Sequence, residues 1–339
     1  MATIDDVARR AGVSASTVSY VLSGKRRISA ATSRRVEQAI QELAYRPNAG
    51  ARALALSRTN IIGLMAPLRV GVDVNVIMQF VAGVTQGARD REFDVLLLTQ
   101  DDGTNLLRVT ESSMIDALVV MDVESEDPRL PTLRALGLPV VLIGLPRDTT
   151  GLSCIDLDFQ QAGSLAATHL IERGHRHVCL LGSPAEVLQR HTSYAVRMNT
   201  GFVAACDAAG VGYSIIPTTA SVAGAHAAVD EMLGVMPETT AVVVHNEVAL
   251  PHVIARLREH GRAVPDDVSL VAVCPENVAV SLPSPVTSIE LPAEQIGRFA
   301  IEMLVARMGG GHPTEVRLLG PTLTERTSVG APPAGTRRN

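Results

Sequence analysis

The sequence predicts a small all-α domain at the N-terminus, followed by a larger body in which β-strands and α-helices alternate. Three observations lead to this fold class. Apolar residues recur at helical spacing in residues 1–46, and short apolar runs alternate with helical stretches from Asn60 onward. The balance of charge also changes sign between the two parts. The length of 339 residues favours two or three domains, each able to bury its own core.

The net charge of −5 hides this division of the chain. Residues 1–58 hold ten Lys and Arg against four Asp and Glu, a net of +6, which leaves −11 for the remainder. A basic head on an acidic body indicates a polyanionic partner for the head alone. A basic face that is merely solvated is the alternative interpretation of the charge.

Three short helices are expected in the head. Thr3 and Asp6 have the spacing of a capping pair, and Gly12 ends the first helix. Ser14 is placed to cap a second helix, and Ser29 precedes a third. The residues expected to face inward are Ile4, Val7, Ala8, Ala11, Val18, Val21, Leu22, Val36, Ile40 and Leu43. Those expected to face outward from the second helix are Ala15, Ser16, Ser19 and Tyr20.

A helix, a glycine-containing turn and a second short helix make the helix-turn-helix pattern. The second helix is short enough to lie in the major groove of DNA, and its outward side chains are mostly small and polar. The loop that follows carries Lys25, Arg26 and Arg27, which suit phosphate contacts. Helix spacing alone leaves open a three-helix bundle with a solvated face.

Two segments of the head resemble the lac repressor family of bacterial regulators. Residues 13–24, VSASTVSYVLSG, resemble the family's recognition helix, and residues 45–54, YRPNAGARAL, resemble its hinge helix. The resemblance continues to about residue 328 and is greatest to actinobacterial repressors of cellobiose or other oligosaccharide uptake. It implies a DNA-binding domain over 1–46, a hinge helix and linker over 47–59, an effector-binding and dimerisation body over 60–330, and a disordered tail over 331–339.

The resemblance also assigns DNA contacts. The positions that face bases in the family match Ala15, Ser16 and Tyr20, whereas Thr17 and Ser19 match phosphate-side positions. Tyr20 departs from the arginine that is usual in the family, so one hydroxyl and a ring replace a bidentate guanine contact. The expected DNA-binding set is Thr3, Ser14, Ala15, Ser16, Thr17, Ser19, Tyr20, Lys25, Arg26, Arg27, Tyr45, Asn48, Ala51 and Leu54.

Leu54 is the most specific of these expectations. It matches the leucine that the family wedges into the minor groove at the centre of the operator, where it kinks a flexible base step. Without the resemblance, Leu54 would be interpreted as an apolar residue of a short helix.

The body is expected to contain two series of strands. Apolar runs predict strands at 61–66, 94–99, 117–121 and 139–144, and a second series after Gly151 at 178–182, 241–245 and 268–273. Helices are expected at 76–91, 160–173, 198–209, 223–235 and 248–260. Two such series indicate two Rossmann-like lobes with a ligand cleft beyond the carboxyl ends of the strands. The family resemblance implies a periplasmic-binding-protein-like body whose chain crosses between the lobes three times.

Candidate effector-binding residues mostly follow strand ends. Arg197 matches a ligand-contacting position of the family, and Phe80, Phe159 and Tyr194 are the stacking candidates among nine aromatic residues. Core packing is the alternative for these aromatic side chains, above all for Phe80. The expected effector-binding set is Asp73, Asn75, Asp101, Phe159, Tyr194, Arg197, Asn246, Glu247 and Glu276.

Several classes of site are not expected. The four cysteines are too widely spaced for a disulfide framework or a zinc cluster, and His175 and His177 lack a third metal ligand. The common catalytic motifs are missing, so we expect neither a cofactor nor a metal. No membrane span or secretory signal is recognised, which makes the cytoplasm the expected location.

These observations predict a homodimeric transcriptional repressor that binds a palindromic operator, one half-site to each head. The resemblance implies release by a small sugar, and a glucose-containing disaccharide of the cellobiose type is the specific expectation. A corepressor-dependent repressor with a non-sugar ligand is the first alternative. A solute-binding protein or a sugar-processing enzyme with the same body is the second, and the enzyme would need Glu247 and Glu276 as its acid pair.

Overall fold

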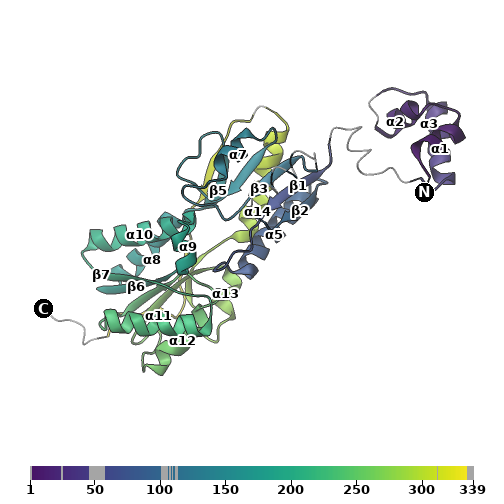
Figure 1. Ribbon diagram of the computed structural model, residues 1–339. Coiled ribbons are helices and arrows are strands. Elements are labelled where there is room, and N and C mark those ends of the chain that lie inside the picture. The colour runs from purple at the N-terminus through teal and green to yellow at the C-terminus, as the bar shows by residue number, and fades with distance from the viewer. Residues whose placement is uncertain are drawn as a thin grey trace.

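The computed structural model describes residues 2–23, 26–45, 58–100, 106, 108, 110, 114–310 and 312–333. It contains a three-helix head and a body of two α/β lobes, as Figure 1 shows. Among these residues, no helix is both long and apolar enough to cross a membrane.

The head consists of α1 (Ile4–Ala11), α2 (Ala15–Ser23) and α3 (Ala30–Glu42), as expected. Local capping sets the helix boundaries. The Thr3 hydroxyl accepts from the Asp6 N–H while the Asp6 carboxylate accepts from the Thr3 N–H at 2.9 Å, a complete capping box. Gly12 ends α1 in the left-handed conformation, with φ of 67°. Ser29 caps α3 by accepting from the Thr32 N–H.

A small apolar cluster holds the three helices together: Val7, Ala8, Ala11, Val18, Val36 and Ala39 are buried in it. Ala15 corrects one expectation, because it is half-buried and packs against this cluster instead of facing outward. It lies three residues before Val18 and therefore shares the inward face of α2. The outward face of α2 is formed by the exposed residues Ser16 and Tyr20, with Ser19 half-buried.

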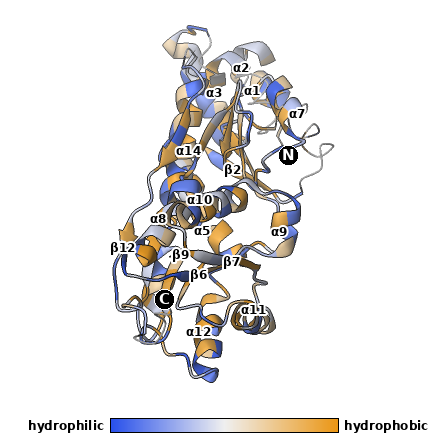
Figure 2. Ribbon diagram, turned by 90° about the vertical axis from the view of Figure 1, so that its left-hand side faces the viewer, coloured by the Kyte–Doolittle hydropathy of each residue, from blue (hydrophilic) through white to orange (hydrophobic). Residues whose placement is uncertain are grey.

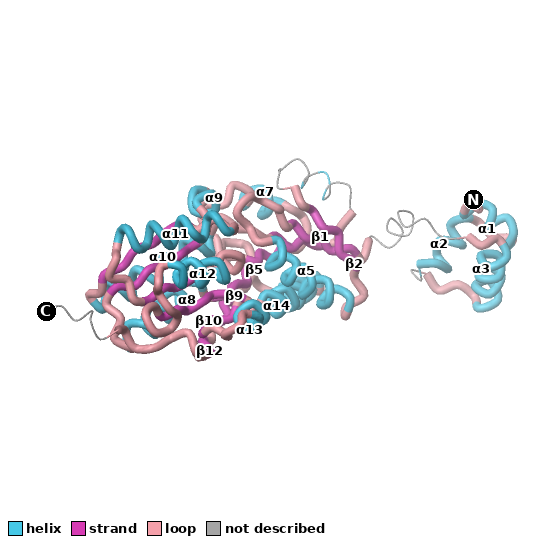
Figure 3. Tube along the Cα trace, turned by 90° about the horizontal axis from the view of Figure 1, so that it is seen from below, coloured by secondary structure: helices cyan, strands magenta, loops and turns pink. Residues whose placement is uncertain are grey.

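The first lobe is built on a parallel sheet in the order β11-β5-β4-β3-β1-β2. Its strands are β1 (Ile61–Met65), β2 (Asp94–Leu98), β3 (Ala117–Val120), β4 (Val140–Ile143), β5 (Ser153–Leu157) and β11 (Val316–Leu319). The helices of this lobe are α5 (Val74–Arg89), α7 (Leu130–Ala135) and α14 (Ala293–Met308). Figure 3 shows α5 and α14 side by side along the lobe.

The second lobe has a sheet in the order β12-β10-β9-β8-β6-β7, parallel except for β12. Its strands are β6 (His177–Gly182), β7 (Gly212–Pro217), β8 (Ala241–Val244), β9 (Ser269–Cys274), β10 (Thr287–Glu290) and β12 (Leu323–Thr324). Its helices are α8 (Phe159–Glu172), α9 (Ala185–Gln189), α10 (Ser193–Ala209), α11 (Val222–Val235), α12 (Leu250–Glu259) and α13 (Glu276–Ser281). In Figure 1, α8 and α10 cover one side of the sheet and α11 and α12 the other.

The chain passes between the lobes three times, after β5, after β10 and between β11 and β12, as expected. One sequence expectation was wrong in detail. The first strand after Gly151 is β5, which joins the first sheet between β4 and β11 and does not begin the second lobe. The edge strand β7 was not predicted, because its segment GYSIIP is only partly apolar.

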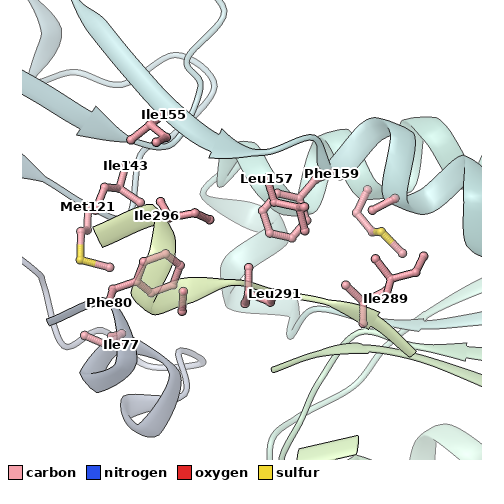
Figure 4. Close-up of a cluster of buried hydrophobic side chains, with 14 of the residues drawn as sticks. Ile77, Phe80, Met121, Ile143, Ile155, Leu157, Phe159, Ile289, Leu291 and Ile296 are labelled. Carbon is pink, nitrogen blue, oxygen red and sulfur yellow. The ribbon is translucent and has the colours of Figure 1, made fainter. Parts of the chain in front are cut away.

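Hydrophobic packing runs continuously through the junction of the lobes. Figure 4 shows Phe80, Met121 and Ile296 of the first lobe followed by Leu157, Leu291 and Phe159 toward the second. The helices around the sheets carry hydrophobic and hydrophilic residues along the same helix, as Figure 2 shows. The crossovers are therefore packed segments of the core, and they place the facing strand ends of the two sheets close together.

Candidate DNA-binding face and effector cavity

The outward face of α2 presents hydroxyl groups and one aromatic ring. The Ser14 hydroxyl lies 2.8 Å from that of Ser16 and 2.9 Å from that of Thr17, so the polar groups at the start of α2 are linked. Tyr20 is exposed, and the Arg26 guanidinium lies 5.9 Å from its ring centroid, a cation–π geometry. Polar side chains next to an aromatic ring and a guanidinium are suited to reading base edges in a groove.

The positive charge of the head is largely available to a partner. Arg9 pairs with Asp6 and Arg10 pairs with Glu42, two exposed ion pairs that use the acids nearest to them. Four further arginines are exposed and form no ion pair with an acid of the described head: Arg26, Arg27, Arg34 and Arg35. Such a surface attracts a polyanion and makes its binding depend on salt.

The remaining expected DNA-binding residues have varied positions. Thr3 is exposed and caps α1, and Tyr45 is half-buried against the apolar cluster of the head. Thr17 and Ser19 are half-buried on α2. Lys25, Asn48, Ala51 and Leu54 lie outside the described residues.

A cavity lies between the lobes, at the carboxyl ends of their strands. It contains about 960 Å³ of space not filled by protein atoms, part of it open to solvent. Its lining comes from both lobes: Ala66, Pro67, Gly71, Val72, Asp73, Val76, Ile77, Phe80, Met121, Asp122, Val123, Ile143, Gly144, Asp156, Phe159, Ser183, Pro184, Tyr194, Ala220, His245, Asn246, Glu247 and Leu291.

Three rings of the second lobe form an aromatic wall of this cavity. The ring centroids of Phe159, Tyr194 and His245 are 5.5 to 5.6 Å apart in each pair. Burial lowers the pKa of His245 to about 4, so its imidazole is neutral at pH 7. Rings packed in this way offer an apolar platform for the C–H faces of a flat ligand.

Four carboxyl groups line the same cavity: Asp73, Asp122 and Asp156 from the first lobe and Glu247 from the second. Burial raises the pKa of Asp156 to about 6, although Arg197 opposes the shift. Burial also raises the pKa of Glu247 to about 7, and the Asp73 charge adds to the rise. The cavity therefore offers hydrogen-bond acceptors in excess of donors.

Two of these carboxyl groups, those of Asp122 and Asp156, form ion pairs with arginines. Arg197 of α10 donates to Asp156 Oδ2 at 2.7 Å and to the Leu157 carbonyl at 2.9 Å, so this ion pair joins the two lobes. Asp122 pairs with Arg69 at 3.0 Å and with Arg190 at 3.3 Å. None of these arginines is among the described lining residues.

A second contact joins the lobes beside the cavity. The Ser193 N–H donates to the Val123 carbonyl and the Ser125 N–H to the His191 carbonyl, both at 2.9 Å. Asp122 and His191, in the two facing loops, have positive φ values of 52° and 53°, which non-glycine residues adopt at a cost. These two residues lie where the loops of the two lobes meet, and the contacts between the loops hold them in this conformation.

Five of the expected effector-binding residues come together in the cavity: Asp73, Phe159, Tyr194, Asn246 and Glu247. Phe80 also lines it while packing in the core. Three others do not line it, namely Asn75, which is exposed, Arg197 and Glu276, and Asp101 lies outside the described residues. Glu276 instead accepts from Arg326 at 2.5 Å, so the Glu247–Glu276 acid pair that an enzyme would need is not assembled.

Sequence reasoning missed Asp122, Asp156, Ser183 and His245 as lining residues. Ser183 follows β6 directly, Asp122 lies two residues beyond β3, and His245, which had been predicted as the last residue of its strand, follows β8. The strand-end rule could therefore have found all three. Asp156 lies within β5, a strand that was not predicted. Asn246 lines the cavity, but its amide donates to the Thr218 carbonyl at 2.6 Å and accepts from the Ala249 N–H at 3.2 Å.

His175 and the cysteines have structural surroundings. His175 Nδ1 lies 2.9 Å from the Thr240 hydroxyl and Nε2 lies 3.2 Å from the Gly330 carbonyl. Within the described part of the chain, no three His, Cys, Asp or Glu side chains are grouped to hold a metal ion. The four cysteines are buried and free, and burial raises the thiol pKa of each.

The two parts of the chain match two family models. Residues 3–48 match that of bacterial regulatory proteins of the lacI family, and residues 167–329 match a periplasmic binding protein-like domain. The transcriptional regulator CelR of Thermobifida fusca is 30% identical over 339 residues, covering 94% of this chain and 95% of that protein. The transcriptional repressor PurR of Vibrio atlanticus is 28% identical, covering 97% of this chain and 99% of that protein.

Solved structures agree with this similarity. A complex of the regulator CelR with cellobiose matches with a TM-score of 0.67 at 28% identity, covering 97% of this chain and 100% of that one. The lac repressor dimer bound to operator and an anti-inducer matches with a TM-score of 0.80, covering 97% and 99%. At 21% identity, the second match supports the fold alone.

Proposed function

The chain belongs to the lacI family of bacterial regulatory proteins, whose members are DNA-binding transcriptional regulators and not enzymes, and we propose that it represses genes for the uptake and use of a sugar. The observation that carries this proposal is a single chain with a hydroxyl-rich α2 face beside unpaired arginines and, in its body, an interlobe cavity with an aromatic wall. The α2 face with its arginines suits an operator, and the cavity between the lobes suits an effector.

For the DNA side, Ser16 and Tyr20 would contact bases, and the exposed arginines of the head would contact phosphates. Ser14, Thr17 and Ser19 would make the hydroxyl contacts to the backbone. Leu54 would enter the minor groove at the operator centre, together with the hinge residues Asn48 and Ala51. Two heads of a homodimer would each bind one half-site of a palindrome in the cytoplasm.

For the effector side, we favour a small sugar of the cellobiose type. The rings of Phe159 and Tyr194 would cover its C–H face, and the carboxyls of Asp73 and Glu247 would accept its hydroxyls. Similarity to CelR, which has been solved with cellobiose, supports this choice of sugar. Arg197 would not contact the sugar itself but would hold Asp156, with which it pairs, in position in the cavity wall.

The proposed domains follow from these roles. Residues 1–46 bind DNA, 47–59 form the hinge and linker, 60–330 bind the effector and dimerise, and 331–339 form the tail. The effector changes how the two lobes are held, which unsettles the hinge and lowers operator affinity. The size of this effect is limited by the difference in effector affinity between the two states of the body.

Operator binding titrated with sugars tests the proposal. A palindromic site is first selected from random DNA with the full chain, and its affinity is then measured by fluorescence anisotropy with cellobiose and related sugars present. We expect cellobiose to weaken operator binding. A ligand that strengthens it would identify a corepressor-dependent regulator, the alternative that similarity to the repressor PurR keeps in view.

Leu54→Ala separates the two sites. Because the wedge lies in the hinge, we expect operator affinity to fall at least about tenfold while effector affinity is unchanged. Leu56→Ala, the same substitution two residues further along the segment, is the matched control and should weaken operator binding less. Unchanged operator affinity in the Leu54 variant would contradict the wedge assignment.

A further inference from the structure

One carboxylate holds the segment through which the chain enters the body. Asp116 Oδ1 accepts from the Thr59 N–H at 2.7 Å and from the Thr59 hydroxyl at 2.9 Å. Asp116 Oδ2 accepts from the Asn60 N–H at 2.8 Å, and the Arg58 Nε lies 3.7 Å from the same oxygen. Three consecutive residues therefore contact one side chain, and we call Asp116 with residues 58–60 the linker anchor.

Backbone hydrogen bonds to two further strands fix the same segment. The Asn60 carbonyl accepts from the Asp94 N–H at 2.9 Å at the start of β2, and the Ile61 carbonyl accepts from the Asp116 N–H at 2.8 Å. Asn60 has a positive φ of 57°, a conformation that asparagine adopts more readily than most residues. The chain therefore makes a defined turn at Asn60 before it enters β1.

Arg58 is restrained by two contacts of its side chain. Its guanidinium lies 4.9 Å from the ring centroid of the buried Phe93, a cation–π geometry, and its Nε pairs with Asp116. Arg58 is the first described residue of the body, and residues 46–57 join it to Tyr45 of the head. The connection to the head therefore starts at a residue that the linker anchor holds.

The Asp116 carboxylate is used entirely on this segment within the described part of the chain. The hydrogen bonds that it accepts come from Thr59 and Asn60, and its ion pair is with Arg58. Its side chain is only 11% exposed, and burying a carboxylate is costly unless hydrogen bonds compensate. A buried charge whose partners are all in residues 58–60 indicates a role in holding the linker.

The linker anchor and the cavity lie at opposite ends of the same two strands. Asn60 directly precedes β1, and Asp116 directly precedes β3, the strand next to β1 in the first sheet (Figure 1). The residues that follow these strands line the cavity: Ala66, Pro67, Met121 and Asp122. The strands are five and four residues long, so about 15 to 20 Å separate the two sites. Two adjacent strands therefore connect the linker with the effector cavity.

We infer that Asp116 is a positioning residue for operator binding, which fixes the point where the linker leaves the body and contacts neither the DNA nor the effector. A linker that leaves from one fixed point presents the head in one position, so less order has to be created on binding. A change in the body reaches the head along the chain by moving this point. The same contacts therefore carry the response to the effector, and this second part rests on the proposed function.

The size of the effect follows from the cost of ordering a chain. Fixing the backbone of one residue costs about tenfold in an equilibrium constant. Asp116→Ala removes the acceptor for both Thr59 donors, so we expect operator affinity to fall about tenfold or more. Asp116→Asn keeps one oxygen for Thr59 but places an amide donor against the Asn60 N–H, so its loss should be smaller.

Fluorescence anisotropy with the full chain and its selected operator measures both variants, with and without saturating cellobiose. We expect the factor by which cellobiose weakens operator binding to fall toward one in Asp116→Ala, whereas a purely structural role would leave this factor unchanged. Calorimetry should show unchanged affinity for cellobiose. Hydrogen exchange followed by mass spectrometry should show faster exchange at residues 59–60 and unchanged exchange in the strands of the second lobe.

Asp148→Ala is the matched control. The Asp148 carboxylate also accepts from a threonine N–H, that of Thr150 at 3.0 Å, and pairs with an arginine, Arg134, at 2.7 Å. These residues belong to the same lobe, but they are not part of the linker anchor and do not line the cavity. The operator affinity of this variant and its response to cellobiose should equal those of the wild type.

The outcomes separate the inference from the proposed function. Operator affinity of Asp116→Ala equal to that of the wild type overturns the inference, and an equal loss in Asp148→Ala overturns its assignment to the linker anchor. Lowered operator affinity with an unchanged response to cellobiose overturns the second part alone. If cellobiose leaves operator binding by the wild type unchanged, the proposed sugar effector is overturned together with the second part, and the operator affinities still decide the first.

Discussion

The head and the body solve the problem of binding in opposite ways. The head is basic, at +6, and four of its arginines are exposed without an ion pair to an acid of the described head. The body is acidic, at −11, and pairs most cations near its cavity with carboxylates. The difference teaches that a surface for a long polyanion keeps positive charge exposed. In a cavity for a small ligand, by contrast, several of the charged side chains are already paired with one another.

Salt should produce the largest difference between the two regions. If the head neutralises about six phosphates, raising the salt from 50 to 200 mM lowers operator affinity about 10³-fold, because counterions are no longer released as favourably. An uncharged effector releases no counterions, so its affinity should change less than about twofold. Anisotropy for the operator and calorimetry for the sugar, on the same protein sample, measure both. If salt weakened sugar binding as steeply as operator binding, the contrast between a charged DNA-binding face and an uncharged effector would be wrong.

Breaking the interlobe ion pair should have the next largest effect, in the body alone. Asp156→Ala leaves Arg197 without its carboxylate and should lower the free energy of unfolding of the body by about 3 kcal/mol. Asp156→Leu combined with Arg197→Met removes both charges and should recover much of the loss. Urea unfolding followed by circular dichroism measures it. A single variant as stable as the wild type would show that the pair contributes nothing to the body.

Removing the unpaired carboxyl should stabilise the body, with a defined pH dependence. The pKa of Glu247 is raised from 4.5 to about 7 in the folded state, so the folded chain holds this proton more tightly than the unfolded chain. The wild type therefore loses stability as the pH rises from 4.5 through 7. Tyr194 and Cys274, whose charges would couple to Glu247, stay neutral there because their pKa values are raised.

Glu247→Gln should consequently be more stable than the wild type by about 1–3 kcal/mol at pH 8 and equal to it near pH 4.5. Thermal unfolding at the two pH values measures the difference. Glu302→Gln, at an exposed position of α14, is the surface control, and its stability should differ from that of the wild type by the same amount at both pH values. A stability difference between Glu247→Gln and the wild type that is largest at low pH would contradict the raised pKa of Glu247.

The smallest effect is expected from a helix cap in the head. Ser29→Ala removes the acceptor for the Thr32 N–H and should destabilise α3 by about 1 kcal/mol, whereas Ser29→Asp should keep the cap. Hydrogen exchange on the full chain should show faster exchange of the head amides alone. Faster exchange in the body as well would show that the two regions do not fold independently.

How well the sequence predicted the structure also differs between the two regions. The helix boundaries of the head were predicted because their signals are local: the Thr3–Asp6 box, Gly12 and the Ser29 cap each act within a few residues. Ala15 was predicted to face outward, but it lies three residues before Val18 and packs on the same inward face of α2. In the body, apolar runs predicted β1, β2, β3, β4, β6, β8 and β9. The strands β5, β7, β10, β11 and β12 were not predicted, and each of their segments contains a polar residue.

By itself, therefore, the sequence determined the helix-turn-helix head, the alternating body and the division of charge, because caps, periodicity and composition are local properties. Tertiary structure decided the cavity. The order of the strands in the first sheet places Asp122 and Asp156 at the cavity. Arg197, which was expected to contact the effector, instead pairs with Asp156, and Glu276 pairs with Arg326. Which charges are compensated depends on side chains about 40 to 70 residues apart in sequence, and only the packing of two lobes brings them together.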